Sequence, residues 1–182
     1  DNVQAKNYYN EMSYAWLGVG NDSYTGDRGI DIVDGGSGNI DVLANVIPDV
    51  EINSTVMKDK TSDTNTVSLG DGNDIYYCGA GTDIVYGGSG EDTFYWYADG
   101  SFDSIIETTR TKEENTIIFD KGISKDHLIA EYVKDKKINL YTSTDKQEGL
   151  SYEGELKYTN IRFADNPNEN FVLDQMGLTF DQ

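Results

Sequence analysis

The 182-residue chain has few of the residues on which many sites depend. Its one cysteine, Cys78, and one histidine, His127, exclude an internal disulfide, thiolate zinc clusters and multi-histidine metal sites. No apolar run approaches the roughly 18 residues of a membrane-spanning helix, and the start shows no basic and apolar signal-peptide pattern. Because the sequence begins at Asp1 rather than Met, we expect it to be a piece of a longer protein.

Basic residues are also scarce: 14 Lys and Arg face 33 Asp and Glu, which gives a formal net charge of −19. Such a surface repels phosphate backbones and anionic lipids, so we expect no nucleic-acid partner, and the natural counter-species are cations. The hydrophobic fraction is only 37%, but 12% of residues are aromatic, including 13 Tyr. Disordered segments normally lack aromatic residues, so the composition indicates a chain that folds.

Glycine is concentrated in a short-period repeat. Fourteen of the 19 glycines lie between Gly18 and Gly38 or between Gly70 and Gly90. Both stretches follow a nine-residue pattern G-G-x-G-x-D-x-U-x, where U is large and apolar, and the third unit has one extra residue. The sixth position is Asp22, Asp31, Asp41, Asp74, Asp83 and Asp92, and the U position is Tyr24, Val33, Leu43, Tyr76, Val85 and Phe94.

The repeat pattern predicts oxygen-lined turns joined by short strands. Closely spaced glycines permit tight turns whose carbonyl groups point inward, and each Asp adds a carboxylate to that ring. The x-U-x that follows is a three-residue strand with one side chain turned inward. Hard cations such as Ca²⁺ take six to eight oxygen ligands, whereas transition metals favour the imidazole or thiolate ligands that are scarce here. The turns therefore predict calcium sites.

These units resemble the RTX family of calcium-binding nonapeptide repeats. The resemblance implies an all-β fold, a right-handed parallel β-roll with a β-rich C-terminal cap, in which each turn stacks on the turn eighteen residues further on. Asp74 and Asp92 would then share one ion, with carbonyl groups of Leu69 and Asp71 from the first turn and of Gly88 and Gly90 from the second.

Other expected sites are less completely defined. Asp22 and Asp41 are nineteen residues apart because of the extra residue. Asp31 and Asp83 would lie at the other edge or at the block ends, and Asp99 or Asp103 would complete the site that Asp83 begins. Roughly four to six Ca²⁺ ions are expected in all. The remaining turn residues assigned to calcium are Gly18, Gly20, Gly26, Gly36, Gly38, Gly70, Gly72, Gly79 and Gly81.

The chain divides into five segments. Residues 1–16, with Tyr8, Tyr9, Met12 and Trp16 near helical spacing, form a possible N-terminal cap. Residues 17–43 are the first repeat block, 44–68 an insertion, 69–106 the second block with its closing turn, and 107–182 a C-terminal flank with a possible secretion signal. In the flank we expect strands at 115–119, 128–133, 137–141 and 158–163, and a turn or short helix capped by Ser124. The roll either continues across the insertion or forms two short rolls.

The resemblance implies a calcium-binding module that folds outside the cell and supports type I secretion of a larger toxin, adhesin or exoenzyme. It would be secreted or held on a bacterial cell surface, with the type I machinery as partner and with no membrane span. An alternative is an adhesion or ligand-binding module for sugar, peptide or surface layer. No catalytic constellation is apparent: His127 stands beside Asp126 without a marked nucleophile, so we do not expect an enzyme in this chain.

Overall fold

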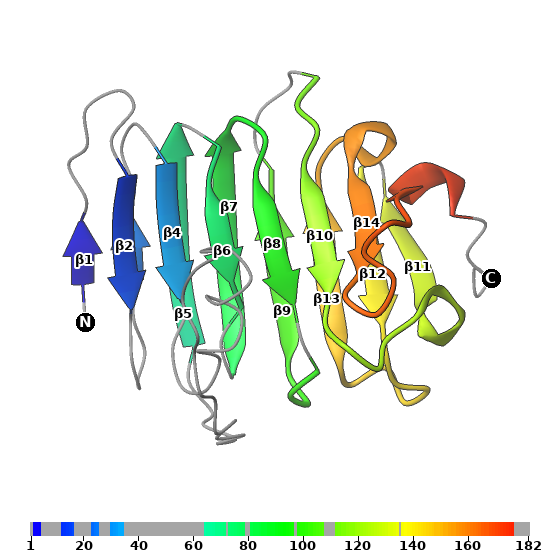
Figure 1. Ribbon diagram of the computed structural model, residues 1–182. Coiled ribbons are helices and arrows are strands. Elements are labelled where there is room, and N and C mark those ends of the chain that lie inside the picture. Colours follow the sequence, from blue (N-terminus) through cyan, green and yellow to red (C-terminus); the bar gives the residue numbers. More distant parts are fainter. Residues whose placement is uncertain are drawn as a thin grey trace.

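The computed structural model describes residues 2–4, 12–16, 23–25, 30–34, 64–71, 73–78, 81–96, 98–107, 112–134 and 136–176. The described chain is all-β, and its helical pieces are three-residue 3-10 turns. Two sheets lie face to face, and their strands stack in sequence order from the N-terminal end to the C-terminal flank (Figure 1). In the described part of the chain, no helix is long and apolar enough to cross a membrane.

From the N-terminus to residue 119, successive strands alternate between the two sheets. The first sheet has the order β1 (Asn2–Gln4), β3 (Ser23–Thr25), β5 (Thr64–Asp71), β7 (Thr82–Ser89), β9 (Phe102–Ile106), β13 (Gly149–Glu153), β12 (Lys137–Tyr141) and β11 (Ile129–Lys134). The second has the order β15 (Phe171–Val172), β14 (Asn160–Phe163), β10 (Thr116–Phe119), β8 (Thr93–Trp96), β6 (Ile75–Tyr77), β4 (Ile30–Asp34) and β2 (Met12–Trp16).

The strand register follows the repeat. Three parallel pairs join residues eighteen apart: Met12 with Ile30, Thr64 with Thr82 and Ile75 with Thr93. The sheets also continue across the segment between β4 and β5, because β3 pairs with β5 and β4 pairs with β6. Part of the expected insertion, residues 64–68, lies in β5.

The core is built from the alternation of side chains along each strand. The repeat residues Tyr76, Val85 and Phe94 are completely buried at their U positions, as the pattern predicts. Val67 of β5 is also completely buried and pairs with Val85. The other three U residues, Tyr24, Val33 and Leu43, are outside the residues whose side chains are described.

The C-terminal flank extends both sheets and then reverses strand direction. β9 pairs in parallel with β13, which continues antiparallel into β12 and β11. β10 pairs in parallel with β14, and β15 is antiparallel to β14. The strands expected near 115–119, 128–133, 137–141 and 158–163 are confirmed as β10, β11, β12 and β14, and Ser124 precedes a 3-10 turn, Lys125–His127.

At the N-terminus, the near-helical spacing was misleading. Met12–Trp16 is a strand that pairs with β4 in the same eighteen-residue register as the repeats. Asn2–Gln4 forms β1 beside β3. Sequence spacing in this segment therefore did not identify its strands, because their conformation is stabilised by pairing with strands far along the chain.

Candidate functional site

The predicted aspartates of the second repeat block lie at the edges of the two sheets. Asp74 and Asp92 directly precede β6 and β8, while Asp83 and Asp103 are the second residues of β7 and β9. These four side chains are 0–1% exposed although each is acidic. For Asp31, Gly70 and Asp71 only the strand conformation is described, and the following predicted residues lie outside the described part of the chain: Asp22, Asp41, Gly18, Gly20, Gly26, Gly36, Gly38, Gly72 and Gly79.

A first acidic cluster contains Asp74, Asp92 and Glu107. The Asp74 amide donates a 2.8 Å hydrogen bond to Asp92 Oδ1, and the Asp92 amide donates one of 2.8 Å to Asn115 Oδ1. Side-chain oxygens thus link β6, β8 and β10 at one edge of the second sheet. Glu107 follows β9 of the facing sheet, where its amide donates to the Glu153 carbonyl at 2.7 Å.

Asp92 and Glu107 bring carboxylate oxygens to the same place. A Cβ built on Gly87 of β7 would lie 2.0 Å from Glu107 Oε1 and 2.7 Å from Asp92 Oδ2. Neither Asp92 Oδ2 nor either Glu107 oxygen makes a hydrogen bond of standard geometry, and all three are buried. A buried carboxylate without a partner carries a large desolvation cost, so a neutralising proton or cation is needed.

The pKa values of this pair reflect that cost. Burial raises the pKa of Glu107 from 4.5 to about 9, the charges of Asp92 and Glu113 add to the rise, and the nearby Asn115 side chain opposes it. Burial likewise raises the pKa of Asp92 to about 7, and the hydrogen bond from the Asp74 amide partly offsets this. At neutral pH, this fold therefore disfavours the ionised form of Glu107 and, to a smaller extent, that of Asp92.

A second acidic cluster contains Asp83, Asp99 and Asp103. The Asp83 amide donates to Asp103 Oδ1 at 2.7 Å, and Trp96 Nε1 donates to Asp103 Oδ2 at 2.6 Å, which links the two sheets. Asp99 Oδ2 accepts from the Gly81 amide at 2.7 Å, and its Oδ1 accepts from the Ser101 amide at 2.8 Å. Both oxygens of Asp99 and Asp103 are thus used in hydrogen bonds.

The second cluster still carries an electrostatic penalty. The pKa of Asp103 is raised well above its ordinary range, first by burial and then by the charge of Asp83. The structure brings both residues expected to complete the Asp83 site, Asp99 and Asp103, into one cluster. This second cluster differs from the first because hydrogen bonds already stabilise the carboxylate oxygens of Asp99 and Asp103.

The glycine-rich turns of the repeat are partly extended. β5 and β7 are each eight residues long, with Gly70 paired to Gly88 and Asp71 to Ser89, whereas the pattern predicted three-residue strands. Leu69 is completely buried in the core. Gly81, Gly88 and Gly90 have φ values of 102°, 105° and 130°, which residues with a side chain rarely adopt.

Side chains alone do not complete a metal site in the described residues. Among them, no group of three or more His, Cys, Asp or Glu side chains is arranged to hold an ion. An ion at either cluster would therefore also need backbone carbonyl groups or water as ligands. The available donors are oxygens, which is the chemistry that Ca²⁺ and Mg²⁺ require.

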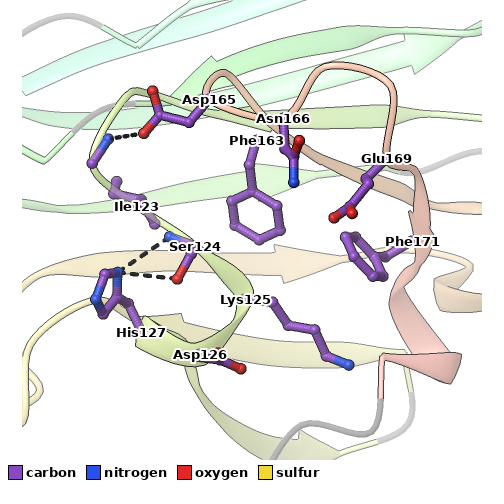
Figure 2. Close-up of a pocket in the computed structure, with 11 residues that line it drawn as sticks. Ile123, Ser124, Lys125, Asp126, His127, Phe163, Asp165, Asn166, Glu169 and Phe171 are labelled. Atoms are coloured by element: carbon purple, nitrogen blue, oxygen red, sulfur yellow. Dashed lines mark hydrogen bonds between the residues drawn. The ribbon is translucent and has the colours of Figure 1, made fainter.

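The C-terminal flank contains a separate cavity of about 510 Å³. Figure 2 shows Phe163 and Phe171 on one side, with Asn166 and Glu169 near them and the 3-10 turn opposite. Lys125 Nζ lies 5.5 Å from the centre of the Phe171 ring and covers one face of it. His127, which was not expected to be catalytic, accepts a 3.2 Å hydrogen bond at Nδ1 from the Ser124 amide at the start of this turn.

No model of a known protein family matches the chain, and no curated protein sequence matches it. Residue geometry and the repeat pattern therefore carry the functional argument.

Two residues that lie at the first cluster, one acidic and one amide, were not predicted from the sequence. Glu107 and Asn115 both lie beyond the last regular repeat, and they fall out of the nine-residue phase. A weak signal for Asn115 was its position at the start of the strand predicted over 115–119. In the structure it directly precedes β10, as Asp74 and Asp92 directly precede β6 and β8. For Glu107 we find no signal in the spacing.

Proposed function

We propose that this chain is a calcium-binding module of the RTX type, a right-handed parallel β-roll that folds when Ca²⁺ binds. The observation that carries the proposal is the set of buried aspartates, Asp74 and Asp92 at one sheet edge and Asp83 at the other, in a stack with eighteen-residue register. Among the described residues, no ion pair includes Asp92. Alternating parallel strands and buried U residues support the roll.

Electrostatics explains why the fold would depend on the ion. Bringing buried carboxylates together without a cation raises their pKa values, as at Asp92 and Glu107, and the chain carries a net charge of −19. Roughly five Ca²⁺ ions would add about +10 and would bridge successive turns through oxygen ligands. Binding free energy then becomes folding free energy, as in other metal-dependent domains.

The direct test is a calcium titration of the calcium-free chain followed by far-UV circular dichroism. The strand signal should rise with Ca²⁺ and should not rise with equal Mg²⁺, because Mg²⁺ demands a smaller octahedral site and dehydrates reluctantly. Asp92→Asn should shift the midpoint to higher calcium. Asp120→Asn, at an exposed position, is the matched control and should leave the midpoint unchanged. A calcium-free chain that already shows the full strand signal at neutral pH would refute the proposal.

The RTX resemblance extends the proposal to secretion. The chain would leave a bacterial cell unfolded through a type I machine and fold outside, where calcium sites of extracellular modules have dissociation constants of about 10⁻⁴–10⁻³ M. Folding outside would also oppose backward movement in the channel. The triple change Asp74→Ala, Asp83→Ala and Asp92→Ala should slow secretion of a protein that carries this module. An unchanged secretion rate would argue against the role in export.

The flank cavity favours a second candidate function, recognition of a small polar ligand such as a sugar. Its lining combines aromatic rings with the amide of Asn166 and the carboxylates of Asp165 and Glu169, a mixture that suits hydroxyl groups. A glycan array with calcium and with EGTA tests this candidate. Binding that is lost in Asn166→Ala but kept in Asp120→Asn would support it.

A further inference from the structure

We infer that Glu107, which lies outside the nonapeptide pattern, joins the repeat residue Asp92 in a binding site for one hard divalent cation at the junction between the repeats and the C-terminal flank. The inference rests on the proposed calcium-dependent function and adds to it a ligand residue and a position that the repeat does not supply.

The carboxylate groups of Asp92 and Glu107 are buried without a cationic partner among the described residues. Asp92 is completely buried and Glu107 is 8% exposed. The Asn115 side chain interacts with the Glu107 carboxylate, but neither Glu107 oxygen nor Asp92 Oδ2 has a hydrogen bond of standard geometry. The oxygens of Asp99 and Asp103, in contrast, are all hydrogen-bonded. Among the described residues, no ion pair includes Asp92 or Glu107.

The carboxylate groups of Asp92 and Glu107 point towards the same place. Glu107 Oε1 and Asp92 Oδ2 both approach the point where a side chain would begin at Gly87. The two residues come from opposite sheets, since Asp92 precedes β8 and Glu107 follows β9. Two carboxylates facing one point from opposite sheets repel each other unless a positive charge lies between them.

A further oxygen, the hydroxyl of Tyr152, lies near the two carboxylates. A Cβ built on Gly154 would lie 2.7 Å from the Tyr152 hydroxyl and 2.9 Å from Glu107 Cβ, so this hydroxyl lies beside the glutamate. Two carboxylates offer up to four of the six to eight oxygens that Ca²⁺ takes, and the hydroxyl, peptide carbonyls or water would complete the set. An ion here would fix the repeat strands to β9 and to the flank strand β13.

The test counts the Ca²⁺ ions bound per chain, by equilibrium dialysis and by calorimetry, in the unchanged chain, Glu107→Gln and Glu114→Gln. Glu114 is exposed, and its change removes the same charge. We expect Glu107→Gln to bind one ion fewer and Glu114→Gln to bind the full number. Glu107→Asp, which keeps a carboxylate on a shorter side chain, should keep the ion with at least tenfold weaker binding.

Each other outcome is decisive. If Glu107→Gln binds the full number with unchanged affinity, the inference fails while the proposed function stands, and a shared proton explains the pair. If the unchanged chain binds no calcium, both fail. If Glu107→Gln does not fold in saturating calcium, Glu107→Asp decides: folding with weaker calcium binding supports a carboxylate ligand, and failure to fold overturns the inference.

Discussion

Acid should partly replace calcium in folding this chain. In the folded state the pKa of Glu107 is about 9, compared with an ordinary value of 4.5, so between these two values the folded chain binds more protons than the unfolded chain. A raised pKa of this kind gives stability that is present below pH 4.5 and is lost as the pH rises towards 9. Lowering the pH without calcium should therefore favour the folded state.

The magnitude follows from the size of the pH step. One pH unit in this range changes the free energy of unfolding by about 1.36 kcal/mol per group, so going from about pH 7.5 to 5 contributes about 3 kcal/mol from Glu107. Asp92, with a pKa of about 7, adds to this below neutral pH, by less than its isolated value because the two groups interact. The folded-to-unfolded ratio should rise by two to three powers of ten, roughly.

The assay is urea unfolding of resin-decalcified protein at several pH values, with Trp fluorescence and circular dichroism as signals. A resin is preferable because EGTA binds calcium weakly in acid, and light scattering at each pH excludes aggregation. Because the calcium-free chain is expected to be largely unfolded at pH 7.5, the gain should be seen as strand signal and a urea transition that develop as the pH falls to 5. With a typical slope of 1–3 kcal/mol per M, about 3 kcal/mol corresponds to about 1–3 M urea. Glu107→Gln should lose most of this shift, whereas Glu114→Gln should keep it. A Glu107→Gln chain with the full pH shift would refute the reasoning.

Three further changes test other parts of the structure. Gly87→Ala would place a Cβ 2.0 Å from Glu107 Oε1, so we expect about 1–3 kcal/mol lower stability in thermal unfolding with calcium; an unchanged melting temperature would contradict the packing described. Asp103→Asn turns an NH₂ group towards a donor, either the Asp83 amide or Trp96 Nε1, and should cost about 1–3 kcal/mol with a change in Trp96 fluorescence. Cys78 is 1% exposed and burial raises the pKa of its thiol, so calcium should slow its reaction with a thiol reagent; equal rates with calcium and with chelator would count against calcium-dependent folding.

The repeat made the inner strands predictable because each unit carries its own information. One buried apolar residue and one Asp recur every nine residues, and the eighteen-residue register follows from strands that alternate between two sheets. The first half of β5 was missed because its unit has Asn65 in place of Asp and lacks the glycines, although Val67 keeps the apolar position.

The rest of the site depends on contacts that no local pattern encodes. β9 pairs with β13 through Phe102 and Gly149, and this distant pairing places Tyr152 beside Glu107. Longer connections in the flank also break the nine-residue period. The Asp92 amide therefore donates its hydrogen bond to Asn115 and not to the residue eighteen positions further on. Tertiary pairing alone brings these residues together.

The pairing of β3 with β5 and of β4 with β6 has a consequence for how this chain tolerates change. Ser23 pairs with Thr66 and Ile32 pairs with Ile75, so both sheets join residues 43 positions apart at this point. A change in β5 therefore acts on β3, 43 residues earlier in the chain, as well as on β7.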